Sequence, residues 1–277
     1  MKTTCVHEVY FMKITVVTVC FNEERNIAKT VESVLSQTSS DFEYIICDGG
    51  SGDKTVEIAR SYEDAFAKKG VKFTVNSERD KGIYDGMNKG IELASGDYVY
   101  FLNAGDWFYS DTVLAEIIEK MGDKAPEVVY GDCLCVDRGV AKIFVSDHTH
   151  LSEYMSIAHP ATLVRADVIK ENVFDISYKI AADYNMMLTL YSKGCEFFKI
   201  DVTVSKFSAD GVSSIRIVRT AEETCDVRER NGIAFDRNAV MCAARKQELR
   251  MKIKRKIPRI IRNFWHKHIK KSQWIGE

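Results

Sequence analysis

The sequence predicts an α/β fold in which a mostly parallel sheet has helices on both faces. Two observations lead to this prediction. Short apolar runs rich in β-branched residues alternate with segments whose apolar residues recur every three or four positions. Polar and glycine residues gather where the apolar runs end. Strands that alternate with helices are typical of a parallel sheet covered on both faces. The 277 residues suffice for one large domain, or for one domain with an appendage.

The first half of the chain contains four apolar runs. Buried strands are expected at Ile14–Cys20, Phe42–Cys47, Val71–Val75 and Tyr98–Leu102. Helices are expected between them, at Ile27–Leu35, at Val56–Phe66 and at Ile83–Ala94. Asp53 is the expected N-cap of the second helix, since Asp is a favoured residue at that position.

After Thr112 the pattern is less regular. Strands are expected at Val128–Tyr130, Ala141–Val145, Ala161–Val164, Phe197–Ile200 and Val202–Phe207, and a helix at Ala182–Tyr191. This half is expected to extend the same sheet. Beyond Ser214 the chain turns polar and is predicted to be helical.

The ends of three predicted strands are polar. Asn22 and Glu23 follow the first strand, residues 48–53 read DGGSGD after the second, and residues 103–106 read NAGD after the fourth. In open parallel sheets, ligands bind outside the carboxyl ends of the strands. The sequence therefore predicts a binding site at this edge.

Charge is distributed unevenly along the chain. The net charge is −1, but residues 244–277 contain 12 Lys and Arg against two Glu, which leaves −11 for the remainder. The eight cysteines have neither the pattern of a disulfide framework nor zinc-finger spacing, which favours a reducing cytoplasm. We expect no signal peptide and no transmembrane helix, because residues 1–11 include His7 and Glu8 and no apolar run reaches about 18 residues.

Four segments together resemble a known family. Ile14–Glu24, Ile45–Thr55, Asp80–Asp106 and Ala181–Leu190 are similar, in that order, to family 2 glycosyltransferases of the GT-A fold, a Rossmann-like fold. The stretch from Asp80 to Ile91 is especially similar to bacterial members that build surface polysaccharides of the colanic-acid type. The resemblance covers residues 13–214. It implies transfer of a sugar from a nucleotide-diphosphate donor to a saccharide acceptor, expected to be lipid-linked, with inversion at the anomeric carbon.

The resemblance places the donor nucleotide at the first two strand ends. Asp48 would accept hydrogen bonds from the base or ribose, with Asn22 and Glu23 beside it. Two alternatives stay open: Asp48 closes an Asx turn over its own loop, and Glu23 simply begins the following helix.

Asp106 is the candidate metal ligand, for Mg²⁺ or Mn²⁺. The family carries an Asp-x-Asp-type signature here, whereas this chain has Asn103 in place of the first carboxylate and Gly105 in place of another. An asparagine can still coordinate through its carbonyl oxygen. Metal dependence is therefore left open, and the alternative is a strand-to-loop turn in which Asp106 starts a helix.

The stretch around residue 80 is implied to complete the donor site. Asp80 and Asp85 flank a helix start, Asn88 shares a helical face with Asp85, and Arg79 is placed to meet the diphosphate. The alternative for these side chains is capping or solvent exposure.

Asp183 matches the late acidic motif that supplies the general base of the family. A carboxylate at the start of a helix is favoured in its ionised form, although a plain N-cap has the same appearance. The family usually has a second acidic residue where Ala182 stands. His159 resembles a position near the acceptor.

The end of the chain has a different character. Apolar residues recur at three- and four-residue spacing among cations, as in a helix that lies on an anionic membrane surface: Ile257, Ile260, Ile261, Phe264, Trp265 and Ile269. A helix docked on the acidic body, in a homodimer, is the alternative, and no nucleic-acid motif accompanies the charge. We expect a GT-A domain at 1–215, a helical extension at 216–243 and a basic tail at 244–277, on the inner face of the cell membrane.

Two other functions compete with sugar transfer. A sugar nucleotidyltransferase needs a glycine-rich basic phosphate loop after the first strand, and this chain has Cys20-Phe21-Asn22-Glu23-Glu24 there. A degenerate transferase that acts as a membrane scaffold is supported by Asn103 and Gly105.

Overall fold

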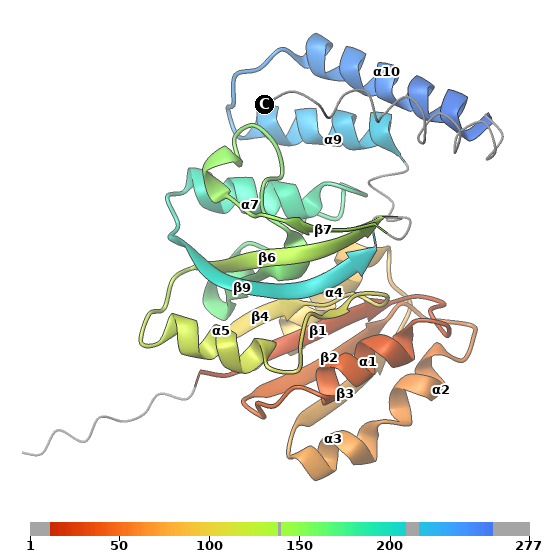
Figure 1. Cartoon of the computed structure of the whole chain (residues 1–277), viewed down its shortest axis with the longest axis vertical. Helices are drawn as coiled ribbons and strands as arrows, with labels where there is room; N and C mark the ends of the chain where they lie inside the picture. The colour runs from red at the N-terminus through yellow and green to blue at the C-terminus, as the bar shows by residue number, and fades with distance from the viewer. Residues whose placement is uncertain (1–11, 138–139, 209–215, 257–277) are drawn as a thin grey trace, which may run out of the picture.

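Helices cover both faces of one mixed sheet in the computed structural model, which describes residues 12–137, 140–208 and 216–256 (Figure 1). The strands are β1 (Ile14–Cys20), β2 (Phe42–Asp48), β3 (Lys72–Ser77), β4 (Tyr98–Phe101), β5 (Trp107–Phe108), β6 (Val128–Asp137), β7 (Val140–Phe144), β8 (Thr162–Arg165) and β9 (Phe197–Ser208). The α-helices are α1 (Ile27–Leu35), α2 (Thr55–Arg60), α3 (Glu63–Lys69), α4 (Ile83–Leu93), α5 (Val113–Met121), α6 (Ala166–Glu171), α7 (Ala182–Ser192), α9 (Ile217–Arg230) and α10 (Arg237–Lys256). Short 3₁₀ turns lie at His148–His150 and His159–Ala161.

The strand order is β3-β2-β1-β4-β8-β6-β9-β5, and β7 pairs with β6. The first four strands of this order are parallel. Cys20 lies opposite Asp48, and Asp48 lies opposite Ser77, so the ends of β1, β2 and β3 are level with one another. Beyond β4 the sheet is mixed, with β8 antiparallel to both β4 and β6. The α/β prediction and the polar edge at the carboxyl ends of the parallel strands are confirmed.

Two cores hold the layers together. Every residue of β1 is buried, as a run of β-branched residues between two layers requires. One core lies under α1, α3 and α5 and includes Val31, Phe66 and Ile117, while the other lies under α4, α6 and α7. Val227 of α9 belongs to the second core, so this helix is packed against the domain through α7. Figure 1 shows α9 and α10 stacked beyond α7, away from α1 to α3.

Two glycines bring α4 close to β1. A Cβ at Gly90 would lie 2.4 Å from Cγ1 of Val17, and one at Gly86 would lie 2.7 Å from Cγ1 of Val19. Real Cβ atoms do not approach other atoms so closely, so only glycine allows this contact. The start of α4 is therefore held beside the end of β1, where the predicted site lies.

Two local predictions are wrong. Asp53 is not the N-cap of α2, since Lys54 holds that position, although Asp53 Oδ1 still accepts a hydrogen bond from the Thr55 N–H at 3.0 Å. The single helix expected there is two helices, α2 and α3. The break lets α3 turn its Phe66 ring onto the ring of Phe73, with centroids 4.6 Å apart.

The two strands expected at Phe197–Ile200 and Val202–Phe207 are one strand, β9. Asp201 does not interrupt it, because its side chain is exposed while its neighbours Ile200 and Val202 are buried. The strand β9 is continuous, but its pairing register with β6 shifts around Asp132.

Residues 257–277, which form most of the predicted basic tail, lie outside the described residues. Among the helices of the described part, none combines the length and the apolar character needed to cross a membrane.

Candidate active site

The Asp48 carboxylate organises the loop after β2. Its Oδ2 accepts hydrogen bonds from the backbone N–H groups of Gly50 (3.1 Å) and Ser51 (2.9 Å) and from the Ser77 hydroxyl (2.7 Å), while Oδ1 accepts from the Ser51 hydroxyl. Burial alone would raise the pKa of Asp48, but these hydrogen bonds outweigh it and hold the pKa below its usual value. Asp48 therefore stays ionised and fixes the loop over which the expected donor would lie.

Asn22 joins the first strand end to the same loop. Its backbone has φ of 54°, in the left-handed region that asparagine tolerates better than most residues. In this conformation its N–H donates to the Ser51 hydroxyl at 2.7 Å, and its Oδ1 accepts from the Gly52 N–H at 2.9 Å. Glu23 lies in the turn that precedes α1, whose N-cap is Asn26, and its carbonyl accepts from the N–H groups of Asn26 and Ile27 at 2.9 Å. Its carboxylate accepts from the Asn26 side chain at 2.7 Å.

Asp80 lies against the glycines of this edge. Its Oδ1 accepts from the Gly82 N–H at 2.9 Å. A Cβ added to Gly49 would lie 2.6 Å from Oδ2 of Asp80, and one added to Gly86 would lie 3.2 Å from it. Asp80 thus wedges between the β2 loop and the start of α4. Arg79 is exposed, and its guanidinium has no ion-pair partner among the described residues.

Asp85 and Asn88 face neighbours of different kinds. Oδ2 of Asp85 accepts from the Lys81 N–H at 2.9 Å, and Asp85 lines a pocket of about 70 Å³ together with Tyr178 and Lys179. Both ends of the Asn88 amide bind the backbone of Phe174, through its N–H and its carbonyl, at 2.9 Å each. Asn88 therefore anchors the segment that leads to α7, with one hydrogen bond from each end of its amide.

Two side-chain oxygens on the loop after β4 have no hydrogen-bond partner within the described part of the chain. The Oδ1 atom of Asn103 is buried and has no hydrogen bond, and the half-buried carboxylate of Asp106 has none among the described residues. Burial raises the pKa of Asp106 to about 7. An orphaned carbonyl oxygen and an uncompensated carboxylate on one turn suit a hard divalent cation. Within the described residues, however, no group of three His, Cys, Asp or Glu side chains is arranged to hold a metal ion.

This loop is anchored to β1 and α1. The Ala104 N–H donates to the Val19 carbonyl at 3.2 Å, and the Thr30 hydroxyl donates to the Asp106 carbonyl at 2.8 Å. The Gly105 N–H in turn donates to that hydroxyl at 3.0 Å. Asn103 and Asp106 are therefore beside the end of β1, adjacent to the segment of Asn22.

Asp183 lies at the first turn of α7, where it meets α4. The Tyr84 hydroxyl is 3.3 Å from Oδ1 of Asp183 and donates to the Ile180 carbonyl at 2.6 Å. The same carboxylate oxygen accepts from the Tyr184 N–H at 2.8 Å. Ala181, not Asp183, occupies the N-cap position, so a plain capping role does not describe this carboxylate.

An aromatic cluster connects Asp183 with the end of β4. The His159 ring stacks on Phe101 at a centroid distance of 5.7 Å and meets the edge of Phe174 at 5.9 Å. Burial lowers the pKa of His159, and the charge of Asp183 offsets this only in part, so the imidazole is neutral near pH 7. Phe101 precedes Asn103 by two residues, so His159 lies near the end of β4 and within reach of the charge of Asp183.

Contacts among the described residues thus join Asn22 to the loop of Asp48, Asp80 to that loop and to α4, and Asp183 to Tyr84 at the start of α4. The structure also adds residues that the sequence did not single out, namely Ser51, Ser77, Tyr84 and Phe174. Tyr84 lies inside the stretch that carried the family resemblance, but its partner Asp183 is 99 residues away. No local spacing could have paired them.

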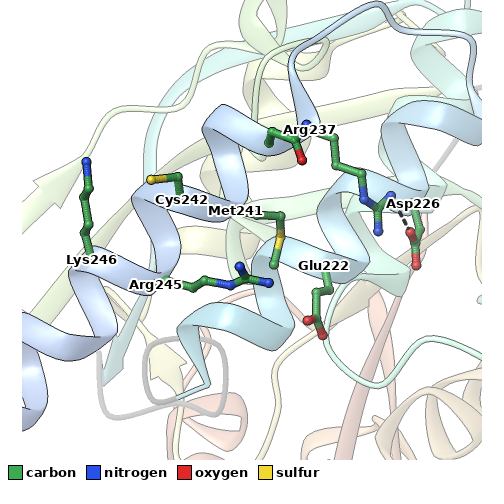
Figure 2. A pocket seen from close by; sticks show the side chains of 8 residues that line it. Glu222, Asp226, Arg237, Met241, Cys242, Arg245 and Lys246 are labelled. Atoms are coloured by element: carbon green, nitrogen blue, oxygen red, sulfur yellow. Dashed lines mark hydrogen bonds and ion pairs between the residues drawn. The ribbon is translucent and has the colours of Figure 1, made fainter.

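A much larger cavity lies elsewhere. It has a volume of about 750 Å³ between α9 and α10, and both charged and apolar side chains line it (Figure 2). Arg237 ion-pairs with Asp226 across it, at 2.9 Å. None of the predicted site residues lines this cavity.

The fold is shared with other solved structures. S. aureus TarS in complex with UDP-GlcNAc matches with a TM-score of 0.65, over 83% of this chain and 69% of that chain, at 17% sequence identity. A mannosyltransferase from Pyrobaculum calidifontis, in complex with GDP-Man and Mn²⁺, matches with a TM-score of 0.60 over 84% and 68%, at 15% identity. At such identities the likeness shows the fold alone, and it confirms the expected GT-A architecture.

Sequence comparison gives the family. The glycosyl transferase family 2 model matches residues 15–182. An uncharacterized glycosyltransferase of Mycobacterium tuberculosis (strain ATCC 25618 / H37Rv) is 33% identical over 210 residues, which are 73% of this chain and 78% of that protein. The chain therefore belongs to glycosyl transferase family 2. A PGL/p-HBAD biosynthesis glycosyltransferase of Mycobacterium bovis (strain BCG / Pasteur 1173P2) is 29% identical over 164 residues, 58% of this chain and 63% of that relative, so the match spans less than two thirds of its length.

Proposed function

We propose that this protein transfers a sugar from a nucleotide-diphosphate donor to a saccharide acceptor, with inversion at the anomeric carbon. The proposal is carried by the carboxylates that follow the parallel strands and their contacts: Asp48 holds the loop after β2, the Asn103 Oδ1 and the Asp106 carboxylate have no hydrogen-bond partner among the described residues, and Asp183 meets Tyr84 at the start of α4. TarS, a distant neighbour in fold, was solved with UDP-GlcNAc, which supports a nucleotide sugar as the donor class.

In this proposal the donor nucleotide lies along the loops of Asn22 and Asp48. The Asp48 carboxylate is saturated by its own loop, so it acts by fixing backbone groups and the Ser51 side chain in place. Arg79 is free to meet the diphosphate, because no described carboxylate pairs with it. Groups held rigid before the donor binds lower the cost of binding it.

Asp183 is the proposed general base. As the acceptor hydroxyl oxygen forms its bond to the anomeric carbon, the bond from that carbon to the diphosphate oxygen breaks. The proton of the hydroxyl passes to the Asp183 carboxylate, and the nucleotide diphosphate leaves. Displacement from the opposite face inverts the anomeric carbon. A positioned base of this kind typically contributes about 10²–10⁴-fold to the rate.

Asn103 and Asp106 are the residues that would hold a divalent cation, Mg²⁺ or Mn²⁺. Such an ion neutralises the negative charge that develops on a diphosphate leaving group. The Pyrobaculum mannosyltransferase was solved with Mn²⁺, which supports this choice of ion. The Asp106 carboxylate is also the group whose own charge is uncompensated without a ligand.

The acceptor is proposed to be a lipid-linked saccharide of a surface polysaccharide, met at the inner face of the cell membrane. The support is the charge of residues 244–277, with 12 Lys and Arg against two Glu. Removal of residues 257–277, which leaves α10 whole, should release the protein from anionic vesicles but not from neutral ones. Unchanged co-sedimentation with anionic vesicles would contradict this assignment.

A donor panel tests the proposed reaction. Purified protein is incubated with UDP-, GDP- and dTDP-sugars and an acceptor extract, and nucleotide release is followed with and without Mn²⁺. We expect release from one donor class, and a loss of at least about 100-fold in Asp183→Asn. Asp201→Asn, an exposed carboxylate on β9, is the matched control and should keep full activity. If no donor binds at all, the chain is a scaffold and not a transferase.

A further inference from the structure

Glu223 is a buried carboxylate that the reaction described above does not use. It lies on α9, beyond the part of the chain that matches the family model, and only 9% of its surface is exposed. Its Oε2 accepts hydrogen bonds from three consecutive backbone N–H groups: Lys179 at 3.0 Å, Ile180 at 2.7 Å and Ala181 at 3.0 Å. Its Oε1 pairs with Arg219 at 3.1 Å.

Three consecutive N–H groups that converge on one oxygen form an anion-binding nest. Here the protein supplies the anion itself, from a helix more than 40 residues further along the chain. Hydrogen bonds to a charged acceptor are about twice as strong as neutral ones. The backbone of residues 179–181 is therefore fixed by α9 from its N–H side.

The same segment is fixed from its carbonyl side by α4. The Ile180 carbonyl accepts from the Tyr84 hydroxyl at 2.6 Å, and the Ala181 carbonyl accepts from the Asn185 N–H at 2.9 Å as α7 begins. Asp183 follows two residues after Ala181. The position of its carboxylate thus depends on a short backbone segment clamped between Glu223 and Tyr84.

We propose that Glu223 is a positioning residue, which sets the orientation of Asp183 through the backbone of residues 179–181; this rests on the proposed role of Asp183 as base. Glu223 touches no donor and no acceptor group in this proposal. It also makes α9 part of the catalytic unit, whereas the sequence analysis assigned residues 216–243 to an extension.

Loss of the Glu223 contact should change kcat without changing the affinity for the donor. The donor lies on the loops after β1, β2 and β4, which have no contact with Glu223. Misplacement of a reacting group by about 1 Å costs on the order of 100-fold in rate. A loss of Glu223 should therefore lower kcat and leave KM for the donor unchanged.

The test compares Glu223→Ala and Glu223→Gln with Glu222→Gln, the exposed neighbour on the same helix. We expect kcat to fall about 10- to 100-fold in Glu223→Ala, with KM for the donor within about twofold of wild type. Glu223→Gln should recover part of kcat, because its amide oxygen accepts from the same N–H groups without the charge. Glu222→Gln should behave as wild type. Amide hydrogen exchange of a peptide covering residues 179–184 should become faster only in the Glu223 variants.

Wild-type kcat in a folded Glu223→Ala protein would overturn the proposal, as would a fall in kcat matched by a rise in KM. If Glu223→Ala does not fold, Glu223→Gln decides between the same outcomes. If the wild-type protein transfers no sugar from any donor, the proposed function has failed. The exchange comparison then decides by itself, since unchanged protection of residues 179–184 in Glu223→Gln would refute the anchoring.

Discussion

The Tyr84 hydroxyl lies 3.3 Å from the carboxylate of Asp183 and 2.6 Å from the Ile180 carbonyl, so one phenol joins α4 to the start of α7. The first of these helices begins at the donor edge of the sheet, and the second carries the proposed base. This contact connects the proposed donor side with the proposed base.

Tyr84→Phe removes this connection and keeps the ring. We expect kcat to fall about tenfold, because Asp183 loses a neighbour that fixes it, and the free energy of unfolding to fall by about 1–2 kcal/mol. Steady-state kinetics and urea denaturation measure the two effects. Tyr98→Phe is the control: its hydroxyl also donates to a buried backbone carbonyl, that of Pro126 at 2.7 Å, but at the other end of β4. It should lose similar stability and keep kcat, and equal kcat in both variants would argue against the connection.

Removal of divalent cations should lower sugar transfer at least tenfold, with recovery when Mn²⁺ or Mg²⁺ is returned. Asp106→Asn should require a higher cation concentration for half-maximal activity, because the one carboxylate of the NAGD loop is lost. The measurement is nucleotide release over a cation titration after chelation. Asp111→Asn changes an exposed carboxylate close by in the sequence and should leave the titration unchanged. Full activity in the presence of chelator would contradict the cation.

Because of Glu43, we expect the free energy of unfolding to fall in acid. Its side chain is fully buried at the start of β2; burial raises its pKa, but hydrogen bonds from Ser95, Lys72 and Thr15 outweigh this and lower the pKa to about 2, from 4.5. A carboxyl with a lowered folded-state pKa contributes stability above its unfolded pKa and loses that contribution as the pH falls to its folded value. The difference in the free energy of unfolding between wild type and Glu43→Gln should therefore shrink by about 3 kcal/mol between pH 5 and about pH 2.

Urea denaturation at pH 7, 5, 4, 3 and 2 measures this dependence. Glu57→Gln, on the exposed side of α2, should leave the pH dependence of stability as it is in wild type. A constant difference between wild type and Glu43→Gln over the whole range would show that Glu43 is not held ionised.

Gly90→Ala should destabilise the protein by about 1–3 kcal/mol, although alanine favours helices over glycine. The added methyl would lie 2.4 Å from Cγ1 of Val17 and would push α4 away from β1. Gly52→Ala makes the same chemical change where nothing lies within 4 Å, and it should leave the melting temperature unchanged. A neutral Gly90→Ala would mean that α4 and β1 are less closely packed than described here.

The sequence predicted well those local features that depend only on residues within one short segment. The bounds of β1 and β2 were predicted to within one residue. Short apolar runs with β-branched residues that are buried on both faces are typical of strands in a parallel sheet. The end of β2 was recognised from a different local signal, the turn chemistry of Asp48 and the glycines that follow it. The break between α2 and α3 was missed, because it depends on where Phe66 must meet Phe73.

By itself, the sequence determined the α/β class, the family and the carboxylates at the strand ends, because period, turn chemistry and motif order are local properties of the chain. Only the tertiary structure decided which of these side chains have hydrogen-bond partners within the described part of the protein. The Asp48 carboxylate binds its own loop, and Oδ1 of Asn103 and the carboxylate of Asp106 have no partner in the described part of the chain. The backbone before Asp183 is held between α4 and α9. Those outcomes depend on contacts between residues far apart in the sequence, which are fixed only when the sheet and its covering helices pack.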